Sequence, residues 1–153
     1  FARLVGIKLG SVTPLSARQH GNQRMSMKVY GIPNCDTVKR ARAWLSAQKL
    51  EYTFHDFKKS GVPLDRLDLW CKEVGWESLL NRQGQTWRKL SDGVKQSIND
   101  ETSARNLMVA QPSVIKRPVI EWPSRGKTPS RITVGFSASA APFLEHSLES
   151  PTP

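Results

Sequence analysis

The residue with the clearest chemical potential is Cys35, which lies between the apolar segment 28–32 and a run of residues with helical spacing. At the start of a helix, unpaired amide groups and the helix dipole favour a thiolate over a thiol. Lys39 and Arg40 add positive charge within one turn, whereas Asp36 acts in the opposite direction. We therefore expect a lowered pKa and a nucleophilic sulfur at Cys35. The alternative is a small buried apolar residue that happens to precede a helix.

The second cysteine, Cys71, shares an apolar helical face with Leu67 and Val74, which favours a place in the core over a role as resolving cysteine. The two cysteines are far apart in a sequence without a metal-binding motif, so we expect neither a disulfide scaffold nor a structural zinc site. The histidines are weaker candidates for a catalytic base, because two fall in terminal segments and one in or beside a strand. They are His20, His146 and His55.

The elements that must position Cys35 are a strand, a helix and a second strand. The sequence predicts a buried strand at 28–32, then a helix over 37–48 whose free amides Asp36 or Thr37 can cap. Alternation of apolar and polar residues predicts a half-buried strand at 52–55. Such a unit normally pairs its two strands in parallel.

The rest of the chain is predicted to be helical in its middle and to return to strands near its end. The further elements are helices at 63–74, 91–98 and 100–110, strands at 115–121 and 132–136, and a closing helix over 137–146 that Pro142 weakens. Residues 76–80 continue the apolar character, and 86–90 are too short to classify. This order predicts an α/β fold with a mixed sheet and a helical insertion.

Length and charge restrict the class of protein. The 153 residues suffice for one domain, which we expect over 27–148 with a short tail at 149–153. We interpret residues 1–26 as a disordered or non-native extension, with Met27 as the natural start. The net charge is +10, but much of the excess lies at the periphery and no nucleic-acid-binding motif is present. No run approaches the ~18 apolar residues of a membrane span, so we expect a cytoplasmic protein that binds neither nucleic acid nor membrane.

The segment from Lys28 to Ala41, KVYGIPNCDTVKRA, resembles the opening of the YffB-like branch of the arsenate reductase (ArsC/Spx) family. Three later segments agree, namely 52–58 (YTFHDFK), 73–90 (EVGWESLLNRQGQTWRKL) and 112–119 (PSVIKRPV). The resemblance spans about residues 27–140. It implies a thioredoxin-like fold, places the nucleophilic cysteine of the family on Cys35 and makes Pro118 the cis-proline that faces it.

The branches of this family suggest different functions. In its arsenate reductases the thiolate attacks arsenate, and glutathione with glutaredoxin resolves the adduct. The Spx branch uses a Cys-x-x-Cys pair and contacts RNA polymerase. Here the fourth position is Val38, so the second cysteine is missing. We therefore expect a thiol-dependent reductase that uses glutathione as co-substrate, with no bound cofactor. Arsenate reduction and a non-enzymatic Spx-like regulator are the alternatives, and RNA polymerase is not an expected partner.

The arginines bear on the arsenate alternative, because an oxyanion substrate needs fixed positive charge around the sulfur. Arg117 matches the family arginine before the proline, but the other two family arginines fall on Asn81 and Gly135. Arg82 and Arg88 lie nearby in sequence and can substitute for them. The residues expected to bind the substrate or thiol ligand are Thr37, Lys39, Arg82, Arg88, Arg117 and Pro118, and no metal is expected.

Two further segments leave alternatives open. Trp87 beside Arg88 suits a groove for a thiol ligand, and equally a packed loop. The loop over 122–131 carries three cations, Arg125, Lys127 and Arg131, which can steer an anionic ligand. A solvated hairpin tip is the expected role of this loop.

Overall fold

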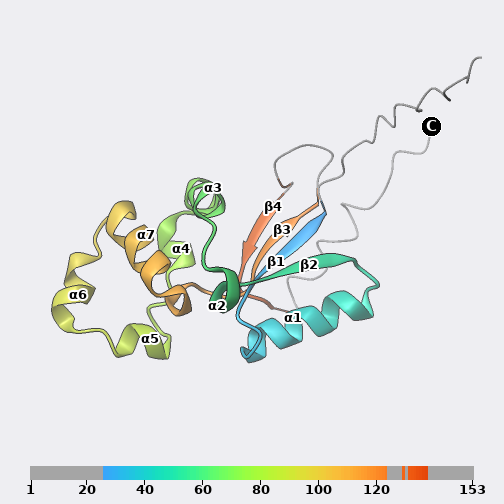
Figure 1. The fold of residues 1–153 in the computed structure, drawn as a ribbon, viewed down its shortest axis with the longest axis horizontal. Helices are drawn as coiled ribbons and strands as arrows, with labels where there is room; N and C mark the ends of the chain where they lie inside the picture. The colour runs from blue at the N-terminus through green and yellow to red at the C-terminus, as the bar shows by residue number, and fades with distance from the viewer. Residues whose placement is uncertain (1–25, 124–128, 130, 138–153) are drawn as a thin grey trace, which may run out of the picture.

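The computed structural model describes residues 26–123, 129 and 131–137 (Figure 1). The described part contains a four-stranded sheet in the order β2-β1-β3-β4. Its strands are β1 (Met27–Gly31), β2 (Tyr52–Asp56), β3 (Val119–Trp122) and β4 (Arg131–Val134). The predicted extension 1–26, the tail 149–153 and the closing helix 137–146 lie outside the described residues, except for residues 26 and 137.

The sheet is mixed, as predicted. β1 and β2 run parallel, with Met27 opposite Tyr52 and Gly31 opposite Asp56. β3 is antiparallel to both β1 and β4. The first three elements therefore form the predicted β-α-β unit, and the return through β3 places a later part of the chain beside β1.

Helix α1 (Asp36–Ala47) follows β1 and covers one face of the sheet. Its buried side chains Val38, Ala41 and Leu45 recur with helical spacing. The predicted side-chain cap by Asp36 or Thr37 is wrong. The N-cap residue is Cys35, whose neutral thiol makes no capping hydrogen bond. The first-turn amides therefore remain free to donate to an anion, including the thiolate form of Cys35.

The helical insertion lies between β2 and β3 in the sequence. It forms the left side of the view in Figure 1, and the four strands of the sheet lie to its right. Its elements are α2 (Phe57–Ser60), α3 (Leu64–Val74), α4 (Trp76–Leu79), α5 (Gln85–Arg88), α6 (Asp92–Ser97), α7 (Glu101–Ala110) and the 3₁₀ turn η1 (Pro112–Val114). The short helix α2 was not predicted. The Asp56 side chain starts it by accepting from the amide of Lys58 at 2.8 Å.

The last two strands are shorter than predicted. The strand expected at 115–121 begins only at Val119, because Pro118 has no amide hydrogen for the sheet. Ile115 instead forms an isolated antiparallel bridge with Leu80. The strand expected at 132–136 ends at Val134, before Gly135, whose φ of 76° leaves the extended region.

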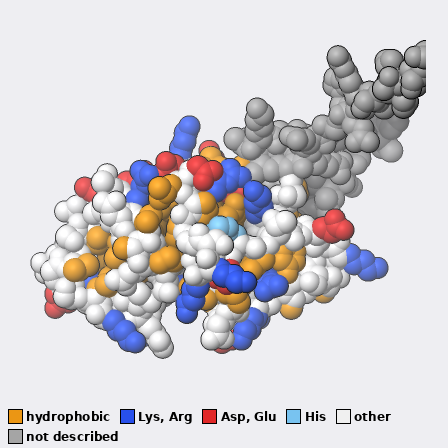
Figure 2. All heavy atoms as spheres, in the orientation of Figure 1, with side chains coloured by type: hydrophobic (Ala, Val, Ile, Leu, Met, Phe, Trp, Pro, Cys, Tyr) orange, Lys and Arg blue, Asp and Glu red, His pale blue; other side chains and the backbone are white. Residues whose placement is uncertain are grey.

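The surface drawn in Figure 2 carries Lys and Arg in separate groups, interspersed with Asp, Glu and apolar side chains. Such interspersed charge is typical of an ordinary solvated surface. Among the described residues, no helix has the length and apolar character needed to cross a membrane.

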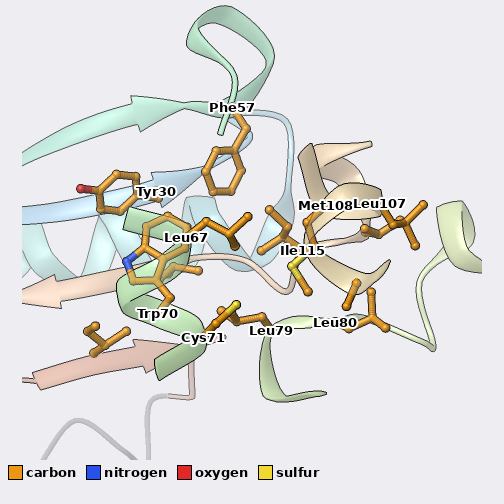
Figure 3. Packing of buried hydrophobic residues seen from close by; sticks show 14 of the residues in the cluster. Tyr30, Phe57, Leu67, Trp70, Cys71, Leu79, Leu80, Leu107, Met108 and Ile115 are labelled. Atoms are coloured by element: carbon orange, nitrogen blue, oxygen red, sulfur yellow. The ribbon is translucent and has the colours of Figure 1, made fainter. Parts of the chain in front are cut away.

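The core divides between the two faces of the sheet, because neighbouring strand residues point to opposite sides. Val29 packs with Leu45 of α1 on one face. Tyr30 packs with Trp70 and Leu67 of α3 on the other (Figure 3). Cys71 belongs to this second cluster and is 4% exposed, which confirms the predicted core position. Burial, with a smaller effect of Glu101, raises the pKa of its thiol to about 11.

Candidate functional site

Cys35 lies at the junction between β1 and α1, at the carboxyl end of a central strand. Its backbone is extended, with φ of −116° and ψ of 125°, and its carbonyl oxygen accepts the first helical bond from the amide of Lys39 at 2.9 Å. The side chain is half-buried. The sulfur is therefore both accessible to a ligand and next to the free amides of the helix.

Opposing effects act on the pKa of the Cys35 thiol. Burial raises it, but hydrogen bonds from the Val38 amide, the Arg117 side chain and the Thr37 amide lower it, as does the charge of Arg117. The net result is a pKa below the ordinary thiol value. A thiolate at this position is the nucleophilic form of the residue.

The positive charge beside the sulfur comes from Arg117, which was predicted to bind the ligand, and not from the cations that lie near Cys35 in the sequence. Lys39 and Arg40 are exposed and are not among the main causes of the lowered pKa of Cys35. Lys39 instead contacts the Asn34 side chain at 3.4 Å. Arg117, which is 82 positions away in the sequence, supplies the charge because β3 pairs with β1.

Arg117 is held in place by a backbone contact. Its Nη1 donates to the carbonyl oxygen of Ser113 at 2.8 Å, and its Nε is buried without a partner among the described residues. A buried donor left unpaired costs free energy. This Nε–H is therefore available to the thiolate or to an anionic ligand atom. No sequence pattern predicted the part played by Ser113.

The floor of the site is apolar and tightly packed. Val38, the residue in the place of a second motif cysteine, is fully buried. A Cβ placed on Gly31 would come within 2.9 Å of Val38 Cγ2 and 3.8 Å of Arg117 Cβ. Glycine at position 31 therefore lets α1 and Arg117 approach the end of β1.

The Arg117–Pro118 peptide bond is cis, as the resemblance implied. The Pro118 carbonyl oxygen accepts from the amide of Gly135 at 2.8 Å. This bond brings Gly135, one of the positions where the family carries an arginine, next to Pro118. With neither a side chain nor a charge, Gly135 adds no anion-binding group there.

The segment with Asn81 and Arg82 approaches from the helical insertion. The Asn81 amide donates to the Val114 carbonyl oxygen at 2.7 Å, which joins this segment to η1 beside Ser113. The Asn81 side chain accepts from the amide of Gln83 at 3.3 Å, so this second family arginine position also lacks a cation. Arg82 is exposed, and its guanidinium carbon lies over two indole rings.

Arg88 ends α5, a helix that contacts η1. Its side chain is exposed, and its carbonyl oxygen accepts from Lys95 Nζ at 3.2 Å. Figure 2 shows the outline of the molecule hollowed between the α5 region and the first turn of α1, with Lys or Arg side chains on both sides. The structure thus brings Cys35, Thr37, Arg117 and Pro118 together, with Arg82 and Arg88 on the neighbouring insertion and Lys39 at the exposed rim.

The site offers no obvious place for a metal ion. In the described part of the chain, no three His, Cys, Asp or Glu side chains group in a way that could hold one. The available chemistry is that of one activated thiolate with cationic and amide donors around it, which suits attack on a disulfide or another electrophilic centre.

Known proteins resemble this chain in sequence and in fold. A sequence model of the ArsC family matches residues 30–141. An uncharacterized protein of Haemophilus influenzae is 42% identical over 92 residues, which are 60% of this chain and 80% of that protein. The global transcriptional regulator Spx of Streptococcus pyogenes is 28% identical over 108 residues, or 69% of this chain and 74% of Spx.

Two solved structures extend the comparison. The protein named YFFB is 45% identical, with a TM-score of 0.68, and the match covers 77% of this chain and 97% of YFFB. An arsenate reductase (ArsC) related protein of Brucella melitensis is 47% identical, with a TM-score of 0.60, and the match covers 79% and 96% of the two chains.

Proposed function

The chain belongs to the ArsC family, and we propose that it is a glutathione-dependent thiol oxidoreductase with Cys35 as its nucleophile. The observation that carries this proposal is the half-buried Cys35 sulfur, whose pKa is lowered by helix amides and by Arg117. A low pKa and access to solvent together distinguish reactive cysteines from structural ones.

The reaction consists of two thiol–disulfide exchanges. In the first, the Cys35 thiolate attacks the glutathione sulfur of a mixed disulfide between glutathione and a substrate thiol. A Cys35–glutathione disulfide forms, and the substrate leaves as a thiolate that takes up a proton. In the second, the thiolate of a free glutathione attacks the bound glutathione sulfur. Glutathione disulfide then leaves and the Cys35 thiolate is regenerated.

A second protein thiol is not required for this cycle. Val38 fills the place of a motif cysteine with a buried apolar side chain. Cys71, the other cysteine, is buried in the opposite core cluster, and burial raises the pKa of its thiol to about 11. External glutathione therefore takes the role that a resolving cysteine has in a dithiol mechanism. A supply of reduced glutathione also fits the cytoplasmic location that we propose.

Arsenate reduction is less well supported by this site. Of the three family arginines, Arg117 is present, whereas Asn81 and Gly135 bring no charge. Three fixed cations would stabilise a multiply charged oxyanion far better than one. We expect no arsenate-dependent oxidation of glutathione in the presence of glutaredoxin. Turnover of arsenate at a rate comparable with glutathione exchange would favour arsenate as the substrate.

A regulatory role like that of Spx also receives less support. Val38 removes the dithiol that a Cys-x-x-Cys switch needs to change state. We therefore expect no association with RNA polymerase in a pull-down that captures a genuine Spx protein in parallel.

Intact-protein mass spectrometry after treatment with oxidised glutathione tests the proposed function. The wild-type chain and Cys71→Ser should each gain one glutathione, and Cys35→Ser should gain none. Reduced glutathione should then remove the adduct. An adduct that persists in Cys35→Ser, or its absence from the wild-type protein, would contradict the proposal.

A further inference from the structure

The side chain of Arg82, on the helical insertion, lies over two tryptophan rings. Its guanidinium carbon lies 5.8 Å from the ring centroid of Trp76 and 5.6 Å from that of Trp87. A guanidinium over an aromatic face is attracted by the ring quadrupole, and Arg stacks in this way better than Lys. Two indoles, one from α4 and one from α5, therefore restrain a side chain that would otherwise be free at the surface.

The charge of Arg82 is not neutralised. No carboxylate in the described part of the chain lies within ion-pair distance of it, and the residue is exposed. Neither indole offers an oxygen acceptor, so the N–H donors of the guanidinium are left for another group. In-plane donors in a fixed fork suit a carboxylate, which can accept two of them at once.

The segment that carries Arg82 is tied to the same turn that holds Arg117. The amide of Asn81 bonds Val114 of η1, and Nη1 of Arg117 bonds Ser113 of η1. Arg117 in turn acts directly on the Cys35 sulfur. The hollow in Figure 2 lies between the α5 region of the helical insertion and the first turn of α1, which follows Cys35. A ligand joined to Cys35 that extends across this hollow therefore meets the insertion.

We propose that Arg82, seated on Trp76 and Trp87, binds a carboxylate of the thiol ligand and thereby selects carboxylate-bearing small thiols such as glutathione over uncharged ones. This inference rests on the proposed thiol exchange at Cys35. Arg82 is a specificity residue in this scheme and takes no part in the sulfur chemistry. Lysine would keep the charge but lose the planar fork and the favourable stacking.

The test compares the rates at which Cys35 exchanges with glutathione disulfide and with the uncharged bis(2-hydroxyethyl) disulfide. We expect Arg82→Gln to slow exchange with glutathione disulfide about fivefold, the size of one partly exposed ion pair. Exchange with the uncharged disulfide should be unchanged. Arg82→Lys should retain only part of the preference. Raising the salt concentration should reduce the preference in the wild-type protein, because exposed charges are screened.

The matched control is Lys72→Gln, which removes one exposed cation from α3, a helix at the opposite side of the view in Figure 1 from α5 and α1. It should leave both rates unchanged. An equal loss with both disulfides in Arg82→Gln, or no loss with either, would overturn the inference while leaving Cys35 as the nucleophile. If wild-type Cys35 exchanges with neither disulfide, the proposed function itself is wrong, and the inference fails with it.

Discussion

Arg117 Nη1 donates to the carbonyl oxygen of Ser113 at 2.8 Å, and this contact fixes the cation that lowers the pKa of Cys35. The bond is made to the backbone, so it depends on the path of η1 and not on the side chain at position 113. The site is assembled from two chain segments that the pairing of β1 with β3 brings together.

Replacing the arginine tests its effect on the sulfur. Arg117→Gln removes both the charge and a hydrogen bond that favour the thiolate, so the pKa of Cys35 should rise. Alkylation by iodoacetamide, measured as a function of pH, should show its midpoint at higher pH and a lower rate at neutral pH. Arg40→Gln removes a cation from the exposed face of α1 and should leave the profile unchanged. An unshifted profile in Arg117→Gln would show that the helix amides alone lower the pKa.

The lowered pKa of Cys35 also makes stability depend on pH. Between the folded pKa and the unfolded value of ~8.5, the unfolded chain binds the proton and the folded chain does not, so stability rises with pH. The wild-type protein should therefore gain stability relative to Cys35→Ser as pH approaches ~8.5, and lose that gain as pH falls through the folded pKa. Urea denaturation of both proteins at several pH values measures the difference. A difference that is constant with pH would contradict the lowered pKa.

The close packing at Gly31 predicts a local defect. In Gly31→Ala the new Cβ would meet Val38 Cγ2 at 2.9 Å, so the end of β1 and the first turn of α1 must separate. Overpacking of this kind costs ~1–3 kcal/mol of unfolding free energy. Alkylation of Cys35 should also slow, because the sulfur moves relative to its amide donors.

Gly93→Ala is the matched control for this change. Gly93 lies in α6 with open space around it, so alanine should raise the unfolding free energy by ~0.5–1 kcal/mol through helix propensity. It should leave Cys35 alkylation unchanged. Equal effects of the two substitutions on alkylation would contradict the prediction that close packing at Gly31 positions the Cys35 sulfur.

A buried carboxylate on β3 makes a further prediction about stability. Glu121 is fully buried and accepts from Trp70 Nε1 at 2.8 Å, Arg66 Nη2 at 3.0 Å and the Tyr30 hydroxyl at 3.1 Å. Glu121→Leu leaves these three donors without their acceptor and should cost ~3–5 kcal/mol of unfolding free energy. Glu121→Gln keeps one acceptor oxygen and should cost less. A Glu121→Leu protein as stable as the wild type in urea would show that the network contributes little.

The sequence by itself determined the local parts of the site. Helical spacing of Val38, Ala41 and Leu45 after a short buried strand sufficed to place Cys35 at a helix start. The same reasoning placed Cys71 in the core, because its apolar neighbours recur every three or four residues. The order of the elements predicted the mixed sheet, and the resemblance to the ArsC family implied the cis bond at Pro118.

Only the tertiary structure decided which cations act on the sulfur and on its ligand. Sequence proximity favoured Lys39 and Arg40, but their long side chains extend into solvent, where charges are weakly coupled. Arg117 acts because strand pairing and the contact with Ser113 bring it into a partly desolvated position. The position of Arg82 over two indoles from separate helices likewise could not be predicted from the sequence, because it depends on how α4 and α5 pack.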